Sequence, residues 1–334
     1  MNHKKIAELA NVSASTVSKA LSGSAEISKE TAERIRQIAI DIGYFKEKTK
    51  RKREYANDGS FLIAVIVPEI MGFHYATIVT CIKNQVEAKG GHIAVYIDDF
   101  DSAKGTKILE SIILHGGTDG VIMFSSPELS FRPNIPIVCC CEVPDGKYDS
   151  IRVCYSKLID DAVGFLAEQG HKHIGFVGEP YTVHAAEQFE AAMHKHSLSF
   201  HPEFVYTVRE RFEKIGHMAA LQILEQKGRP SAVIAAYDEI AIGLMASLTR
   251  NGIRVPEDIS VMGINNIPSA VHAQIPLTSV QTFSSEQYKT AVDVLFDRIA
   301  DETLPVKHII IEHTILERET TSQIKENCCA REDQ

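Results

Sequence analysis

Short apolar runs alternate with helical stretches from Phe61 onward, and this alternation limits the possible folds more than any other feature of the chain. Apolar runs that indicate buried strands lie at residues 61–67, 92–97, 120–124 and 135–141, and again at 173–177, 231–236 and 259–264. Helices are expected between them, near residues 74–89, 103–115, 156–169, 184–196, 213–227 and 239–251. This alternation is typical of parallel sheets with helices on both faces, so we expect two similar α/β lobes.

Length and composition indicate a multidomain globular protein. A chain of 334 residues exceeds the roughly 250–300 residues at which single hydrophobic cores stop growing. Hydrophobic residues make up 44% and charged residues 24% of the chain, as in ordinary globular proteins. No apolar run approaches the roughly 18 residues that span a bilayer, and residues 1–6 carry no apolar secretory stretch. We therefore expect a cytoplasmic protein without membrane association.

The charge is distributed unevenly along the chain. The net charge is -9, but residues 1–53 contain twelve Lys or Arg and six Asp or Glu, a net +6 that leaves -15 for the remainder. A small basic module on an acidic body indicates a polyanionic partner for the N-terminal segment alone.

The N-terminal segment has the pattern of three short helices. The first is expected over residues 4–10, and a second begins after Ser13, a good N-cap, and runs to Leu21. A third begins at Ser28 and ends at Gly43. The outward face of the second helix is expected to consist of Ala14, Ser15, Ser18, Lys19 and Ser22.

Two helices joined by a short turn can place the second helix in the DNA major groove. Small hydroxyl side chains such as those of Ser15, Thr16 and Ser18 suit close approach to phosphates and bases, and Lys19 adds a charge for a guanine edge or a phosphate. The alternative is a polar helix face that is simply in water.

The sequence of this segment resembles the DNA-reading domain of the LacI/GalR repressor family. The resemblance rests on IAELANVS at residues 6–13 and TVSKAL at 16–21, and it continues through 28–31 and 43–44. In the large domain it extends through residues 170–174, 238–243, 255–261 and 276–280, so that it covers roughly residues 3–320. It implies a sequence-specific DNA-binding transcriptional regulator, a repressor, and not an enzyme.

The resemblance also implies roles for individual residues in DNA binding. Positions that match Ala14, Ser15 and Lys19 read bases in the major groove, and those that match Thr16 and Ser18 hold phosphates. Because Ala14 is small, we expect it at most to touch a thymine methyl group.

A charged linker follows Tyr44 and departs from the family pattern. In the family this stretch inserts a leucine into the minor groove, but this linker has no leucine; its place is taken by Arg53 or by Tyr55, depending on the direction of counting. Arg53 would join basic residues on phosphates or in a narrow minor groove, whereas Tyr55 would act as an aromatic wedge. A flexible tether without a wedge is a further alternative. The expected DNA contacts of the linker are Lys50, Arg51, Arg53 and Tyr55.

The fold implied is a small all-α helix-turn-helix domain followed by an α/β two-lobe periplasmic-binding-protein-like domain with parallel sheets. The expected divisions are a DNA-binding domain (1–45), a hinge (46–60), an effector-binding and dimerisation domain (61–322) and a tail (323–334). Within the large domain, we expect an N-lobe at about 61–155 and 284–305 and a C-lobe at about 156–283 and 306–322. A homodimer on a palindromic double-stranded operator is expected, because two half-sites increase the affinity of a short reader.

A small-molecule effector is expected in the cleft on which the two lobes close, beyond the carboxyl ends of the strands. The expected effector-binding residues are Phe73, Tyr75, Ser125, Tyr181, His184, Tyr237, Asp238 and Asn265, with His74 beside them. Two charged ligand residues of the family are replaced, by Ala185 and Asn265. A sugar-like effector, a different ligand, and an idle pocket with a protein coeffector therefore remain alternatives.

Other functional classes have less support. The sequence contains no Gly-x-Gly-x-x-Gly motif, no Walker loop and no His-Glu-x-x-His motif, so no cofactor is expected. No metal site is expected either, because neither the cysteine run 139–141 nor the triplets 171–173 and 194–196 have chelating spacing. A solute-binding protein would need a signal segment. An α/β enzyme would need acid–base residues at strand ends, and for Asp238 the role of helix N-cap is expected instead.

Overall fold

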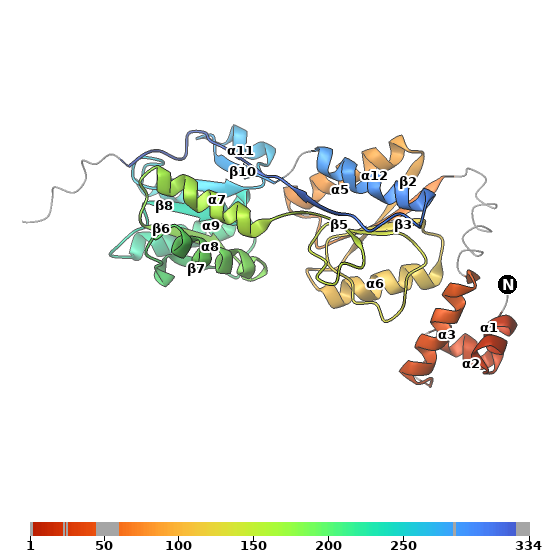
Figure 1. The fold of residues 1–334 in the computed structure, drawn as a ribbon. Coiled ribbons are helices and arrows are strands. Elements are labelled where there is room, and N and C mark those ends of the chain that lie inside the picture. The colour runs from red at the N-terminus through yellow and green to blue at the C-terminus, as the bar shows by residue number, and fades with distance from the viewer. Residues whose placement is uncertain (1–2, 23, 25, 45–59, 283–284, 325–334) are drawn as a thin grey trace, which may run out of the picture. The chain divides into compact units, whose positions relative to one another are not determined.

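A computed structural model describes residues 3–22, 24, 26–44, 60–282 and 285–324 of the chain. The N-terminal part consists of α1 (His3–Ala10), α2 (Ala14–Leu21) and α3 (Lys29–Asp41) (Figure 1). Ser13 and Ser28 are the N-caps of α2 and α3, and each side-chain oxygen accepts a hydrogen bond from the backbone N–H three residues later. Both expected caps are thus confirmed, and they explain where these helices begin.

A small apolar core joins the three N-terminal helices. Ile6, Val17 and Ile35, one from each helix, are fully buried. Arg34 donates a hydrogen bond to the carbonyl oxygen of Ala10 at 3.0 Å and so satisfies the C-terminal end of α1. The outward side chains of α2 are therefore held on a packed frame.

The first α/β lobe contains a six-stranded sheet in the order β11-β5-β4-β3-β1-β2. Its strands are β1 (Phe61–Val67), β2 (Gly91–Ile97), β3 (Gly120–Met123), β4 (Ile137–Cys139), β5 (Asp149–Val153) and β11 (His308–Ile311). Its helices are α5 (Phe73–Ala88), α6 (Ser102–His115) and α12 (Ser285–Ala300). The helices α5 and α12 cover one face of the sheet and α6 covers the other (Figure 1). Strands β1 to β4 pair in parallel, as the sequence pattern predicts, and β5 adds to them in parallel.

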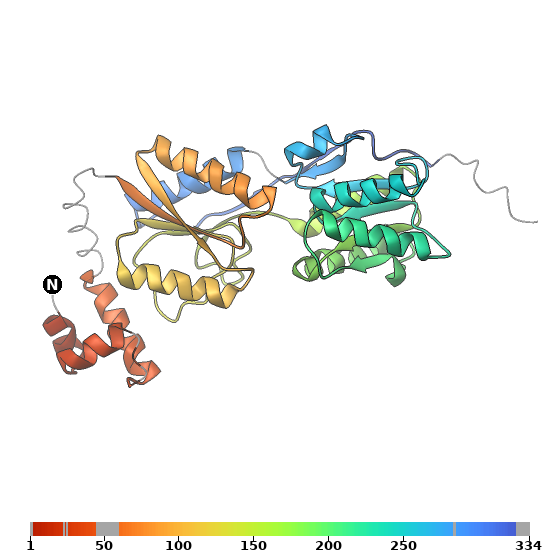
Figure 2. The same ribbon diagram turned by 180° about the vertical axis from the view of Figure 1, so that it is seen from behind.

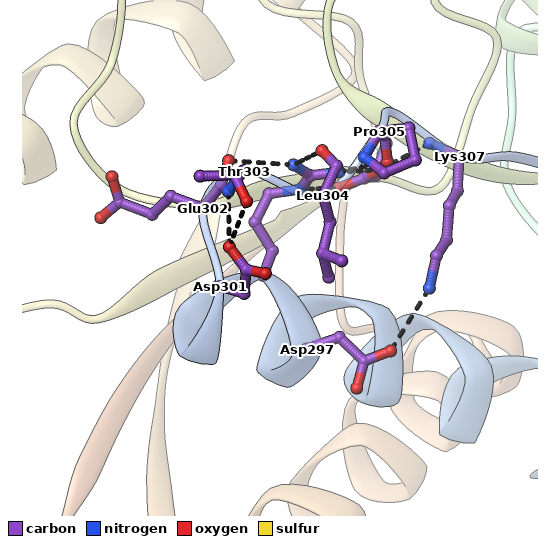
Figure 3. A network of polar contacts seen from close by, with 9 residues as sticks. Asp297, Asp301, Glu302, Thr303, Leu304, Pro305 and Lys307 are labelled. Carbon is purple, nitrogen blue, oxygen red and sulfur yellow. Dashed lines mark hydrogen bonds and ion pairs between the residues drawn. The ribbon is translucent and has the colours of Figure 1, made fainter.

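A buried ion pair fixes the end of this lobe where α12 turns into β11. Arg298 binds Asp149 at the start of β5 through two nitrogens, at 2.5 and 2.9 Å, and both side chains are largely buried. The guanidinium also donates to the carbonyl oxygens of Leu304 and Pro305 in the turn of Figure 3. The backbone N–H of Lys307 donates to the same carboxylate at 2.8 Å. One arginine therefore ties together a helix, a strand and the turn between α12 and β11.

The second lobe repeats the architecture, with the strand order β12-β10-β9-β8-β6-β7. Its strands are β6 (Ile174–Gly178), β7 (Val205–Thr207), β8 (Ala232–Ala235), β9 (Ser260–Ile264), β10 (Thr278–Gln281) and β12 (Thr314–Leu316). Its helices are α7 (Tyr155–Glu168), α8 (Val183–Lys195), α9 (Glu213–Glu225), α10 (Asp238–Arg250) and α11 (Pro268–His272), with short 3-10 turns at Pro180–Thr182 and Pro202–Phe204. The helices α7 and α8 cover one face, while α9 and α10 cover the other, which faces the viewer in Figure 2. Only β12 runs antiparallel to its neighbour β10 among the pairs that the described residues show.

The chain divides into two compact units, residues 1–152 with 285–309, and residues 153–284 with 310–334. Strand β11 belongs to the first sheet, although its residues fall in the range 306–322 that was expected in the C-lobe. The sequence pattern did not indicate β5, β7, β10, β11, β12, α11 and α12. The strands among these have only three to five residues, and β11 and β12 contain no buried residue, so they lack the buried apolar run of the central strands.

No helix in the described ranges combines the length and apolar character that crossing a membrane requires.

Candidate nucleic-acid interface and ligand-binding residues

The outer face of α2 carries small polar side chains on a rigid support. Ala14, Ser15, Ser18 and Lys19 are exposed, whereas Val17 and Ala20 on the opposite side are buried in the three-helix core. The exposed residues follow directly after the Ser13 cap, whose hydroxyl oxygen accepts from the Thr16 N–H at 3.0 Å. A turn of three residues separates α1 from α2, which is the geometry of a helix-turn-helix element.

Three polar side chains of α2 and its C-cap have partners within this domain. The Thr16 hydroxyl lies 2.8 Å from that of Ser13, and the exposed Ser22 donates to the carbonyl oxygen of Lys19 at 3.1 Å. The Lys19 ammonium forms an exposed ion pair with Glu26. Exposed pairs contribute little to stability, so a phosphate or base edge can displace Glu26. The expected DNA contacts Lys50, Arg51, Arg53 and Tyr55 lie outside the described residues.

Aromatic side chains gather at the strand ends of the first lobe. Phe73 opens α5 and is half exposed, and Tyr75 lies two residues further on. The ring of Tyr75 contacts those of Phe100 and Phe124 edge-on, with centroids 6.1 and 5.7 Å apart. His74 packs edge-on against Tyr75, and burial lowers its pKa to about 3, so it is neutral. Such rings offer stacking surfaces for a sugar or a base.

Ser125 also lies at this edge of the sheet, just beyond β3, and its hydroxyl donates to the carboxylate of Asp98 at 3.1 Å. Asp98 is only 1% exposed and follows β2, and burial raises its pKa. The Ser125 hydroxyl is therefore directed to a buried carboxylate of its own lobe.

The second lobe places a charged cluster at its strand ends, and the sequence analysis missed its two charged members. Glu179 follows β6 and is 3% exposed. One of its carboxylate oxygens accepts from Arg211 at 2.5 Å and from the Tyr237 hydroxyl at 3.0 Å. The position of Glu179 directly after a buried strand was a usable signal, because ligands of such folds bind beyond the carboxyl ends of the strands. Arg211 lies in a loop after β7, a strand that the sequence did not reveal.

Tyr181 and His184 are more exposed than the other expected residues of this lobe. The Tyr181 ring is 57% exposed and lies beside the Arg211 guanidinium, 5.4 Å from its centroid. His184 lies in the first turn of α8 and contacts Glu187 at 3.1 Å, with its side chain 88% exposed. Tyr181 thus joins the charged cluster, whereas His184 contacts Glu187 on its own helix.

Asn265 is held in a tight turn directly after β9. Its φ of 102° and the 52° of Asn266 place two successive residues in the left-handed region. The Thr282 hydroxyl donates to the Asn265 side-chain oxygen at 2.9 Å, and the Asn265 N–H donates to Val280. The amide is therefore oriented by β10 and the residue that follows it.

The expected role of Asp238 as a helix N-cap is wrong. Tyr237 is the N-cap of α10, and it makes no side-chain capping bond. Asp238 is fully buried, and its two carboxylate oxygens accept from the Ser279 hydroxyl at 2.6 Å and from the Ile267 N–H at 2.7 Å. Burial raises its pKa to about 7. Asp238 is thus a buried residue that holds the turn containing Asn265 in place.

Replacing Asp238 by asparagine is expected to lower the free energy of unfolding by about 1–3 kcal/mol, because one of the two donors loses its acceptor in a buried site. Urea denaturation of the full chain measures this effect. Asp293→Asn, which removes the exposed ion pair with Lys89, is the matched control and should cost less than about 1 kcal/mol. Equal midpoints for the two variants would show that the carboxylate does not hold the turn.

The consecutive cysteines lie on β4 and directly after it. Cys139, Cys140 and Cys141 are free thiols, and burial raises the pKa of Cys140 well above its usual range. A raised pKa opposes the thiolate form that reactive and metal-binding cysteines need. In the described part of the chain, no three His, Cys, Asp or Glu side chains gather as metal ligands do.

Two family models match separate parts of the chain. Residues 4–47 match the bacterial regulatory proteins of the lacI family, and residues 163–321 match the periplasmic binding protein-like domain. The chain is similar to the HTH-type transcriptional repressor CytR of Escherichia coli K12, with 27% identity over 308 residues that cover 89% of each protein.

Solved structures show the same fold. A transcriptional regulator CelR–cellobiose complex superimposes with a TM-score of 0.66 and 22% identity, and covers 96% of this chain and 99% of the other. A LacI family transcriptional regulator from Enterococcus faecium with bound ribose gives a TM-score of 0.67 and 22% identity, with 79% of this chain and 100% of the other covered.

Proposed function

Because the chain belongs to the lacI family of bacterial regulatory proteins and is a DNA-binding repressor with an effector-binding domain, not an enzyme, we propose that it binds a palindromic operator as a homodimer. We further propose that a neutral, sugar-like effector at the strand ends of the large domain controls its operator affinity. We expect a dimer because the helix-turn-helix domain is small. One short recognition helix covers a single half-site, whereas a dimer engages two.

The observation that carries the operator-binding proposal is the outer face of α2. Its first turns present Ala14, Ser15 and Ser18, whose small side chains allow the helix axis to approach base edges closely. Lys19 adds a positive charge one turn later, and the net +6 of residues 1–53 supports attraction to phosphates. The opposite face of α2 is buried in the three-helix core, so only the outer face is available to contact DNA.

The effector proposal rests on the kinds of side chain at the strand ends. In the first lobe, the rings of Phe73 and Tyr75 lie at the strand ends. In the second lobe, taken by itself, Tyr237, Asn265 and the Glu179–Arg211 pair do so. Rings that stack on a sugar face together with amides and charged groups that bind hydroxyls are the usual composition of a sugar site. The cellobiose and ribose bound by the two regulators described above belong to this ligand class.

Selection of bound duplexes from a random pool by the intact protein tests the operator proposal, followed by titration of the best duplex at several salt concentrations. We expect a palindromic sequence to be enriched. The affinity of the protein for this duplex should fall steeply as the salt concentration rises, because each neutralised phosphate releases counterions. Light scattering of the complex then gives two chains per duplex. Enrichment of a single half-site with one chain bound would contradict the dimer.

Replacing Ser15 by alanine is expected to relax base preference at one operator position in each half-site by about 1–3 kcal/mol, the usual cost of one lost base contact. Repeating the selection with the variant measures this directly. Ser102→Ala, an exposed serine in the first turn of α6, is the control and should select the original operator. An unchanged preference in both variants would remove Ser15 from the base-reading residues.

A further inference from the structure

We propose that the Glu179–Arg211 ion pair is the charged anchor of the effector site and that it selects a neutral polyhydroxyl ligand over an anionic one. This inference rests on the proposed function, since it takes the strand ends of the second lobe as the effector-binding wall. It names the residues that take over from the two charged ligand positions of the family, where this chain has Ala185 and Asn265.

The polar and charged groups of the proposed site share one edge of the second sheet. In the sheet order β9-β8-β6-β7, each strand is followed by one member of the set: Asn265 after β9, Tyr237 after β8, Glu179 after β6 and Arg211 in the loop after β7. These four strands are parallel, so their carboxyl ends lie along one edge of the sheet. That edge is where ligands of open α/β sheets bind.

The buried carboxylate of Glu179 has an acceptor oxygen available for a ligand. Its Oε1 accepts from both Arg211 and Tyr237, and the carboxylate also takes part in a capping box with Thr182 in the turn after β6. The buried Oε2 has no hydrogen-bond partner among the described residues. Burial and the neighbouring carboxylate raise the pKa of Tyr237, so the phenol stays protonated and donates. A buried carboxylate oxygen without a donor is costly, and a ligand hydroxyl would supply one.

Arg211 is held in a fixed position by its neighbours. Its guanidinium lies over the ring of Phe212 at 4.8 Å and beside that of Tyr181 at 5.4 Å, and its side chain is 29% exposed. Phe212 has a φ of 56°, in the left-handed region that a phenylalanine rarely adopts, and its N–H donates to the Tyr237 hydroxyl oxygen. Strained residues of this kind persist where the surroundings hold them, and they cluster at ligand-binding sites.

The charge of the pair defines the ligand class. A carboxylate and a guanidinium side by side sum to zero, and together they offer an acceptor and planar donors that suit adjacent hydroxyl groups. The rings of Tyr181 and Phe212 suit the apolar face of a sugar. A phosphate or carboxylate on the ligand would place a second negative charge near the buried carboxylate of Glu179, which is unfavourable.

The test is titration calorimetry of the full-length protein with neutral sugars, among them D-ribose and cellobiose, each paired with an acidic counterpart such as D-ribose 5-phosphate or cellobionic acid. At least one neutral sugar is expected to bind, with its acidic counterpart at least about tenfold weaker. Arg211→Met and Glu179→Gln are each expected to weaken the neutral sugar by about tenfold or more, because each loses hydrogen bonds to a charged group. Arg211→Lys should recover part of the loss.

Arg209→Met is the matched control, since Arg209 is an exposed arginine of the same loop, and it should bind the sugar as the unchanged protein does. Any of three results would overturn the proposal. The acidic counterpart could bind more tightly than its neutral sugar, both Arg211→Met and Glu179→Gln could keep the wild-type affinity, or no neutral sugar could bind. Each variant is also titrated with the selected operator without sugar. Unchanged operator binding shows that it is folded, and a loss of operator binding by the unchanged protein would instead contradict the proposed function.

Discussion

Replacing Arg298 by methionine is expected to lower the free energy of unfolding by about 3–5 kcal/mol, because it leaves the carboxylate of Asp149 buried without its cation. Asp149 is 1% and Arg298 15% exposed, so water replaces little of the lost interaction. The variant also loses the hydrogen bonds to the carbonyl oxygens of Leu304 and Pro305, which hold the turn before β11. Figure 3 shows this turn.

Urea denaturation of the full chain, followed by circular dichroism, measures the effect. Lys307→Met removes the nearby exposed pair with Asp297 and should cost less than about 1 kcal/mol. The double variant Asp149→Ala with Arg298→Met should be less destabilised than the sum of its single variants, since the second change removes an already unpaired group. Additive costs would show that the two side chains do not act as a pair.

Local rules predicted much of the fold. Ser13 and Ser28 begin helices because a serine oxygen satisfies an N–H that the first helical turn leaves open, and this signal needs no tertiary information. The buried strands β1 and β8 are equally visible, since a strand covered on both faces is apolar throughout. These rules also placed Tyr237 and Asn265 at strand ends, where the structure has them.

Residues whose roles depend on distant partners were not predictable in this way. Asp238 has the sequence position of a helix N-cap, but its acceptors are used by Ser279 and Ile267, which lie 41 and 29 residues away. Glu179 and Arg211 are 32 residues apart and meet only because β6 and β7 are neighbours in the sheet. The local sequence pattern around a residue does not indicate a partner that is distant in the sequence. The charged cluster could therefore be found only in the structure.

Replacing Gly243 by alanine is expected to lower the free energy of unfolding by about 3 kcal/mol, the upper end of the cost of overpacking. A Cβ at Gly243 would lie 2.1 Å from the carbonyl oxygen of Glu213 on α9, and one at Gly216 would lie 2.1 Å from that of Ile240 on α10. The obstacle is backbone in both cases, so no side-chain rotation relieves it and the two helices must move apart. Chemical denaturation of the full chain measures the cost.

Gly228→Ala is the matched control, because the added Cβ would meet no described atom within 4 Å and the backbone is not left-handed. It should leave the urea midpoint unchanged, while Gly216→Ala should match Gly243→Ala. Since both helices cover the same face of the sheet that ends in Tyr237 and Glu179, moving them apart should also weaken sugar binding in Gly243→Ala. Equal midpoints for Gly243→Ala and Gly228→Ala would show that α9 and α10 do not pack through their glycines. In a helix, glycine is unfavourable relative to alanine by about 1 kcal/mol, so helix propensity alone predicts that Gly243→Ala stabilises the protein. Packing against α9 predicts the opposite. The sign of the change in the free energy of unfolding therefore decides between the two effects.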